Sequence, residues 1–115
     1  MTVLRFKMEQ ELRPYAIQFI DVFGDFLRKQ REHLGLFNFS DKKDLDKKME
    51  DLLYARTNIY VALNDNGDIV LPMKNADIFQ EALITILEFN KHEAFNLMED
   101  EELALIKLLK LEPSI

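Results

Sequence analysis

The sequence predicts a single α+β domain in which helices dominate. Apolar residues recur every three or four positions over most of the chain, which is the spacing of amphipathic helices. Two short stretches instead alternate or cluster strand-forming residues, and Asn66-Gly67 is the strongest short-range signal for a β-hairpin. With 115 residues, 48% of them hydrophobic, and only three Gly and three Pro, the chain suits one compact domain over residues 1–115.

The N-terminal segment predicts a short strand. Residues 3–8 alternate so that Leu4, Phe6 and Met8 share one side. Leu4, Met8 and Leu12 are also four residues apart, so a short helix is the alternative. A lone hairpin elsewhere in the chain needs a third strand or a helix packed across its face, so both alternatives stay open for this segment.

A long amphipathic helix is predicted over residues 14–34. Pro14 suits its first turn, where the missing N–H removes no hydrogen bond. Gly35 is placed to end it in a left-handed conformation. The apolar stripe runs through Ala16, Phe19, Ile20, Phe23, Leu27 and Leu34.

A second helix is predicted over residues 41–56, with Ser40 or Asp41 able to cap its first free N–H groups. Its apolar positions are Leu45, Met49, Leu52 and Leu53, and its other face carries the opposite-charge pairs Asp44–Lys48 and Lys47–Asp51.

After residue 56 the helical spacing of apolar residues gives way to strand-forming residues, which predict a β-hairpin. Its predicted strands are residues 59–65 and 68–71, joined by a two-residue turn at Asn66-Gly67 in which both residues tolerate positive φ. Pro72 ends the second strand.

The C-terminal part predicts two or three further helices, for four to five in all. The helix over 76–89, capped by Asn75, is apolar nearly all round. Such a helix belongs at the centre of a core or in a homodimer interface, and both alternatives stand. The chain is expected to bend at Asn90 and to restart as a helix to Met98. A last helix begins with Glu99–Glu102 and ends before Pro113.

Composition excludes several classes of function. The chain has no Cys, which rules out disulfides, thiolate metal sites and thiol nucleophiles. Neither a signal peptide nor an apolar run of membrane-spanning length is expected, so we predict a cytoplasmic protein without a membrane partner. The net charge of −6 disfavours non-specific binding to nucleic acids and is compatible with a basic protein partner.

No catalytic, metal or cofactor site is predicted. Glu88 and His92 have the spacing of two helical metal ligands, but a catalytic zinc needs three protein ligands and no H-E-x-x-H is present. The acidic residues around Gly67 are similar to a calcium loop, yet its first and twelfth positions would be Ala62 and Met73, which cannot chelate. With no Gly-rich phosphate loop either, we expect a protein that is not an enzyme and needs no cofactor.

Residues 23–36 contain the pattern Leu-Arg-Lys-x-Arg-Glu-x-x-Gly-Leu, which resembles the opening helix of the lambda-repressor-like helix-turn-helix family. The resemblance covers this segment alone and implies a DNA-binding regulator. Its phosphate contacts would be Arg28, Lys29, Arg31, Lys42 and Lys43. The pattern that follows lacks a tight turn and a polar recognition helix, and the net charge has the wrong sign. Nucleic-acid binding is therefore the alternative function.

Two features favour binding to another protein. Phe37 and Phe39 lie in a short interhelical connection, where they either tuck under helix ends or form an exposed aromatic anchor. The run Glu99, Asp100, Glu101 and Glu102 either opens a helix or steers a basic partner. We predict a small acidic interaction module of the inhibitor, immunity-protein, adaptor, phage-accessory or small-chaperone type.

Overall fold

The computed structural model describes residues 2–35, 38–92 and 96–115 and confirms a helix-dominated α+β fold. The helices and strands in chain order are β1 (Val3–Phe6), the 3-10 turn η1 (Gln10–Leu12), α1 (Arg13–Glu32), α2 (Phe39–Val61), β2 (Ile69–Pro72), α3 (Met73–Lys91) and α4 (Glu99–Leu109).

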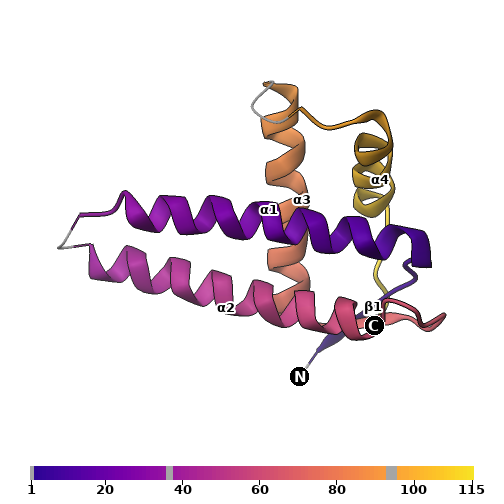
Figure 1. Cartoon of the computed structure of the whole chain (residues 1–115). Helices are drawn as coiled ribbons and strands as arrows, with labels where there is room; N and C mark the ends of the chain where they lie inside the picture. The colour runs from indigo at the N-terminus through magenta and orange to yellow at the C-terminus, as the bar shows by residue number, and fades with distance from the viewer. Residues whose placement is uncertain (1, 36–37, 93–95) are drawn as a thin grey trace.

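The helices form a flat assembly. Helices α1 and α2 run antiparallel as a long pair, α3 crosses behind them, and α4 stands beside the upper part of α3 (Figure 1). The pair projects beyond α3 at the end where α1 leads into α2, so this end forms an arm (Figure 1). The principal extents of 46 × 37 × 20 Å reflect this two-layer, elongated shape.

Helix α3 lies at the centre of the core. It packs against α1, α2, α4 and both strands. Phe79 meets Phe6 of β1 edge to face, with ring centroids 6.3 Å apart. Its other buried apolar residues are Ala76, Ile78, Ala82, Leu83 and Ile86, while Ile84 is exposed. The central-core alternative therefore accounts for the apolar sequence of residues 76–89.

The predicted hairpin of residues 59–65 and 68–71 is wrong. Residues 59–61 are the last turn of α2, and the segment to 65 contains no strand. The second predicted strand is present as β2, but it pairs antiparallel with β1, with Leu4 opposite Leu71 and Phe6 opposite Ile69. Of the two alternatives left open for the N-terminal segment, the structure therefore shows the strand.

Tertiary burial explains why α2 continues through strand-forming residues. Leu52, Ala55 and Ile59 lie three and four residues apart, and all three are buried in the core. Burying this stripe outweighs the modest strand preference of Ile59, Tyr60 and Val61, because propensities amount to less than about 1 kcal/mol per residue.

Side chains from the start of α1 secure the loop between α2 and β2. Arg13 donates to the carbonyl oxygen of Met8 from Nε (3.1 Å) and Nη2 (2.9 Å), and also to the carbonyls of Ala62 and Gly67. The Gln10 amide donates to the carbonyls of Asn64 (2.8 Å) and Asp65 (3.0 Å). These bonds replace the expected hairpin ladder, and the φ of Gly67 lies outside the left-handed region that the predicted turn needs.

Several helix boundaries differ from the sequence prediction. Helix α1 ends at Glu32 without a left-handed Gly35, because the N–H of His33 returns to the carbonyls of Lys29 and Gln30. Asn38, rather than Ser40 or Asp41, occupies the cap position of α2.

Helix α3 also begins earlier than expected, at Met73, so Asn75 is not its cap. The buried Asn75 amide donates instead to the carbonyl oxygen of Asp51 in α2, at 2.8 Å. The separate helix predicted from Asn90 to Met98 is not found. Asn90 belongs to α3, and residues 96–98 are not helical. Residues 93–95 lie outside the described residues.

The C-terminal segment completes the sheet region. Arg5 donates its N–H to the carbonyl of Ser114 (2.7 Å) and accepts the Ser114 N–H (2.9 Å). Strand β1 is therefore flanked by β2 on one edge and by Ser114 on the other.

Candidate functional site

The predicted aromatic anchor is exposed where the structure describes it. Phe39 is the first residue of α2, at the end of the arm, and its surface is 70% exposed. It therefore does not tuck under a helix end. Phe37 lies outside the described residues.

Two residues of the predicted acidic run have partners within the chain. Asp100 accepts a hydrogen bond from the Tyr15 hydroxyl at 2.9 Å, and Glu101 accepts one from the Gln18 amide. Glu101 also accepts the backbone N–H of Met98 at 2.9 Å, which secures the first turn of α4. The hydrogen bond to Asp100, followed by desolvation and the charges of Asp100 and Glu101, raises the pKa of the Tyr15 phenol. These contacts join α4 to α1, whereas Glu99 and Glu102 are exposed.

The basic residues proposed for DNA contact gather on the arm, but both arginines are already paired. Arg28 pairs with Asp25 within α1, and Arg31 pairs with Asp46 of α2, each at 2.7 Å. Lys29, Lys42 and Lys43 form no ion pair with any described residue.

The arrangement implied by the helix-turn-helix resemblance is not found in residues 39–61. That segment is one 23-residue helix lying antiparallel to α1, rather than a short helix, a turn and a recognition helix.

A groove that the sequence analysis did not predict runs between α1 and α2, on the face turned away from α3. Its volume is about 500 Å³. Its apolar lining comprises Ile20, Gly24, Met49, Leu52 and Leu53, and its charged rim comprises Asp21, Asp25, Arg28 and Arg56.

Gly24 creates the hollow at the middle of this groove. A Cβ at this position would meet Leu52 Cδ2 at 3.7 Å, so Leu52 forms the floor beneath the missing side chain. Leu52 is buried, whereas the adjacent Leu53 is 61% exposed. The groove therefore places a protruding leucine beside a hollow.

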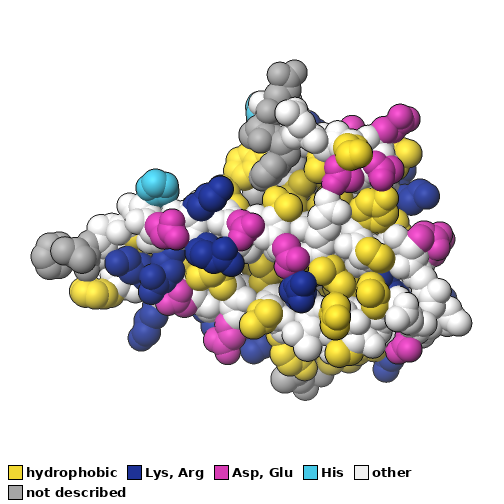
Figure 2. All heavy atoms as spheres, in the orientation of Figure 1, with side chains coloured by type: hydrophobic (Ala, Val, Ile, Leu, Met, Phe, Trp, Pro, Cys, Tyr) yellow, Lys and Arg dark blue, Asp and Glu magenta, His cyan; other side chains and the backbone are white. Residues whose placement is uncertain are grey.

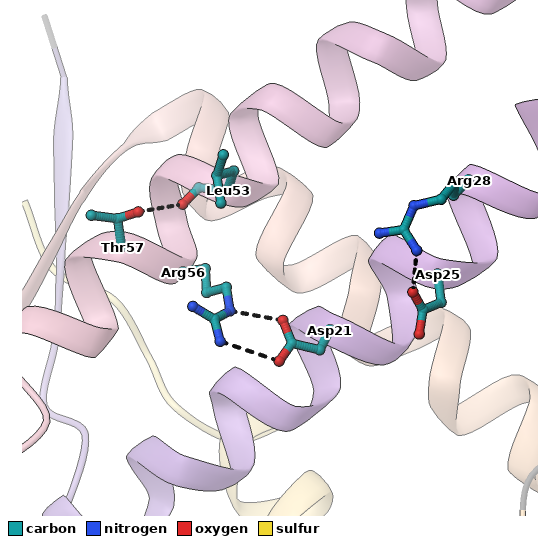
Figure 3. A network of polar contacts seen from close by, with 6 residues as sticks. All are labelled: Asp21, Asp25, Arg28, Leu53, Arg56 and Thr57. Atoms are coloured by element: carbon teal, nitrogen blue, oxygen red, sulfur yellow. Dashed lines mark hydrogen bonds and ion pairs between the residues drawn. The ribbon is translucent and has the colours of Figure 1, made fainter.

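The rim is built from two ion pairs (Figure 3). Arg56 of α2 reaches across to Asp21 of α1, with Nε to Oδ1 at 2.7 Å and Nη2 to Oδ2 at 3.4 Å. The hydrogen bond to Asp21 raises the pKa of the Arg56 guanidinium, and partial burial opposes this effect. The Arg28–Asp25 pair lies at the other end of the groove. Exposed ion pairs of this kind add little stability, so they chiefly orient charge along the rim.

Exposed apolar surface extends the groove along α2. Tyr60 is 59% exposed, and the Arg56 guanidinium carbon lies 5.8 Å from its ring centroid, a cation–π contact. Figure 2 shows charged side chains crowding the arm and hydrophobic side chains gathering over the opposite half of the α1–α2 pair.

One sequence signal could have indicated this groove. Gly24 interrupts an otherwise well-formed helical pattern, and glycine inside a helix costs about 1 kcal/mol relative to alanine, which suggests a packing or binding reason. The Asp21–Arg56 pair carries no such signal, because its members are 35 residues apart in the chain.

The described residues contain no group of three His, Cys, Asp or Glu side chains placed to hold a metal ion. Among the same residues, no helix is long and apolar enough to cross a membrane.

Comparison with known proteins does not place the chain in a family. No protein-family model matches it, and no curated protein and no solved structure is significantly similar to it. A function for this chain therefore has to come from its own geometry.

Proposed function

We propose that this chain is a small protein-binding module that acts without catalysis and docks its partner on the groove between α1 and α2. The observation that carries the proposal is the exposed Leu53 beside the hollow at Gly24, enclosed by charged pairs on both sides.

This arrangement has the anatomy of a protein interface. Interfaces bury an apolar centre and surround it with polar groups that stay in contact with water. The groove has an apolar floor in Ile20, Met49 and Leu52, and its rim is formed by exposed ion pairs. A partner that inserts one or two apolar side chains would cover Leu53 and leave the rim charges hydrated.

Charge supports a protein partner over a nucleic acid. The lining of the groove carries two acidic and two basic side chains, so it offers a polyanion no net attraction. The net charge of −6 disfavours a nucleic acid as the partner, and the absence of cysteine supports a cytoplasmic location.

The test is affinity capture of the tagged chain from lysate of its source organism, with and without nuclease. Leu53→Glu places a charge at the centre of the groove on an exposed residue, so the fold is retained. Leu103→Glu is the matched control, because Leu103 is 54% exposed on α4 and lies outside the groove.

The expected result is a stoichiometric polypeptide that survives nuclease, is lost with Leu53→Glu and is kept with Leu103→Glu. An equal loss with both variants, or no loss with Leu53→Glu, would rule out the groove as the docking site. Recovery that depends on intact nucleic acid would contradict protein binding and support the helix-turn-helix resemblance.

A further inference from the structure

The molecule exposes more surface than a compact monomer of its size. Its solvent-accessible area is 7504 Å² for a mass of 13.6 kDa, whereas monomers of this mass expose about 6,600 Å². The radius of gyration of 14.5 Å likewise exceeds the roughly 13 Å expected for this length. The elongated shape thus leaves extra surface of the same order as the ~800 Å² that each partner buries in a standard interface, spread over the whole molecule.

The charges along α1 are arranged for pairing with an identical helix. Asp21 and Arg28 both line the groove and lie two helical turns apart, with Gly24 next to their midpoint. If two α1 helices meet antiparallel with this midpoint at their crossing, Asp21 of each copy faces Arg28 of the other. A two-fold axis forms both contacts at once, as an isologous interface requires.

We infer that the occupant of the groove is a second copy of this chain, bound face to face about a two-fold axis that passes beside Gly24 and Leu53. A Cβ at Gly24 would meet Leu52 Cδ2 of the same chain at 3.7 Å, so the glycine deepens the α1–α2 groove at the point where the two copies meet. Leu53 of each copy then lies close to the axis, next to Leu53 of the other copy.

The rim pairs become one alternating network in this dimer. Within each copy Arg56 bonds Asp21, and Arg28 bonds Asp25. The two-fold axis adds a contact between Asp21 and the Arg28 guanidinium of the second copy. Arg56 and Asp21 of one copy are then followed along the network by Arg28 and Asp25 of the other. Each carboxylate therefore lies beside a guanidinium. Arginine suits the shared positions because its guanidinium has five N–H donors.

This inference rests on the proposed function, since it names the partner of the same groove. The two are tested separately. Purified chain contains no other protein, so its self-association is independent of any partner captured from lysate.

The first measurement is sedimentation equilibrium of the purified chain and of two charge-reversal variants. Arg28→Glu sets a negative charge against Asp21 of the second copy, and we expect it to weaken dimerisation at least about tenfold. Lys29→Glu is the matched control, since it makes the same charge change on the adjacent residue, which does not line the groove. It should change the dimer dissociation constant by less than about threefold.

The second measurement uses the absence of cysteine in this chain. Leu53→Cys supplies a single thiol beside the proposed axis, and mild oxidation should convert most of the protein into a disulfide-linked dimer. Leu103→Cys supplies an equally exposed thiol on α4 and should remain largely monomeric under the same conditions.

A chain that stays monomeric in sedimentation would overturn the inference, while groove-dependent capture of a different protein would leave the proposed function standing. A dimer that Arg28→Glu and Lys29→Glu weaken equally, or that cross-links through position 103 as readily as through 53, would also overturn it. Nuclease-dependent capture would count only against the proposed function.

Discussion

Arg13 holds a positive charge inside the protein and has no carboxylate partner among the described residues. It is only 1% exposed, and it bonds the backbone carbonyls of Met8, Ala62 and Gly67. A buried guanidinium is tolerated when its donors are satisfied, and carbonyl dipoles perform this role here. One side chain thereby joins the start of α1 to both ends of the loop that leads into β2.

Replacing Arg13 should therefore destabilise the protein. We expect Arg13→Met to lower the free energy of unfolding by about 2–4 kcal/mol, because it removes several charge-assisted hydrogen bonds and leaves carbonyl groups without their donors. Urea denaturation measures this change. Arg5→Met is the control, since the Arg5 side chain is exposed and should change stability by less than about 0.5 kcal/mol. Equal stability of the two variants would contradict a role for Arg13 in holding the loop.

At the scale of single elements, the length of α2 determines which strands pair. It continues to Val61, so the chain cannot turn back as a hairpin at Asn66-Gly67, and β2 becomes available to β1. A helix and a strand predict different burial for Ile59 and Val61. In a strand these residues share one face, whereas in α2 Ile59 is fully buried and Val61 is 71% exposed.

Alanine substitutions distinguish the two arrangements. We expect Ile59→Ala to cost about 2–5 kcal/mol of unfolding free energy, because it leaves a cavity in the core. Val61→Ala should change it by less than about 0.5 kcal/mol, since that side chain is exposed. Thermal or urea unfolding of both variants measures the difference. Comparable losses at the two positions would instead support an extended segment.

The elements that sequence patterns predicted correctly are those determined by local periodicity. The stripe from Ala16 to Leu27 and the acidic start of α4 each define a helix without reference to the rest of the chain. The pairing of β2 was missed because it depends on β1, which is remote in sequence. The groove was missed for the same reason: Asp21 and Arg56 become neighbours only when α1 and α2 pack.

At the scale of the whole molecule, charge is distributed unevenly. Residues 25–50, which include the arm, carry seven Lys or Arg and six Asp or Glu, whereas the rest of the chain carries eight and fifteen. The net negative charge therefore belongs to the body of the molecule. The arm is close to neutral, and its two arginines are engaged with Asp25 and Asp46.

This distribution predicts negligible affinity for DNA. Fluorescence anisotropy with a labelled duplex should show no binding at about 0.2 M salt and at most weak binding at about 0.05 M. Replacing Arg28 and Arg31 together with alanine should leave the signal unchanged. Tight binding that weakens steeply with salt and disappears in the double variant would instead assign these arginines to phosphate contacts.

The position of β1 between β2 and Ser114 has a consequence for the order of folding. Of the strands and helices that the structure describes, the ribosome makes β1 first, yet its second neighbour is available only once residue 114 has been added. The α1–α2 pair needs only a short connection to close and can assemble while synthesis continues. The earliest strand to be made is thus among the last to be fully paired, and until then the growing chain must keep Phe6 from other apolar contacts.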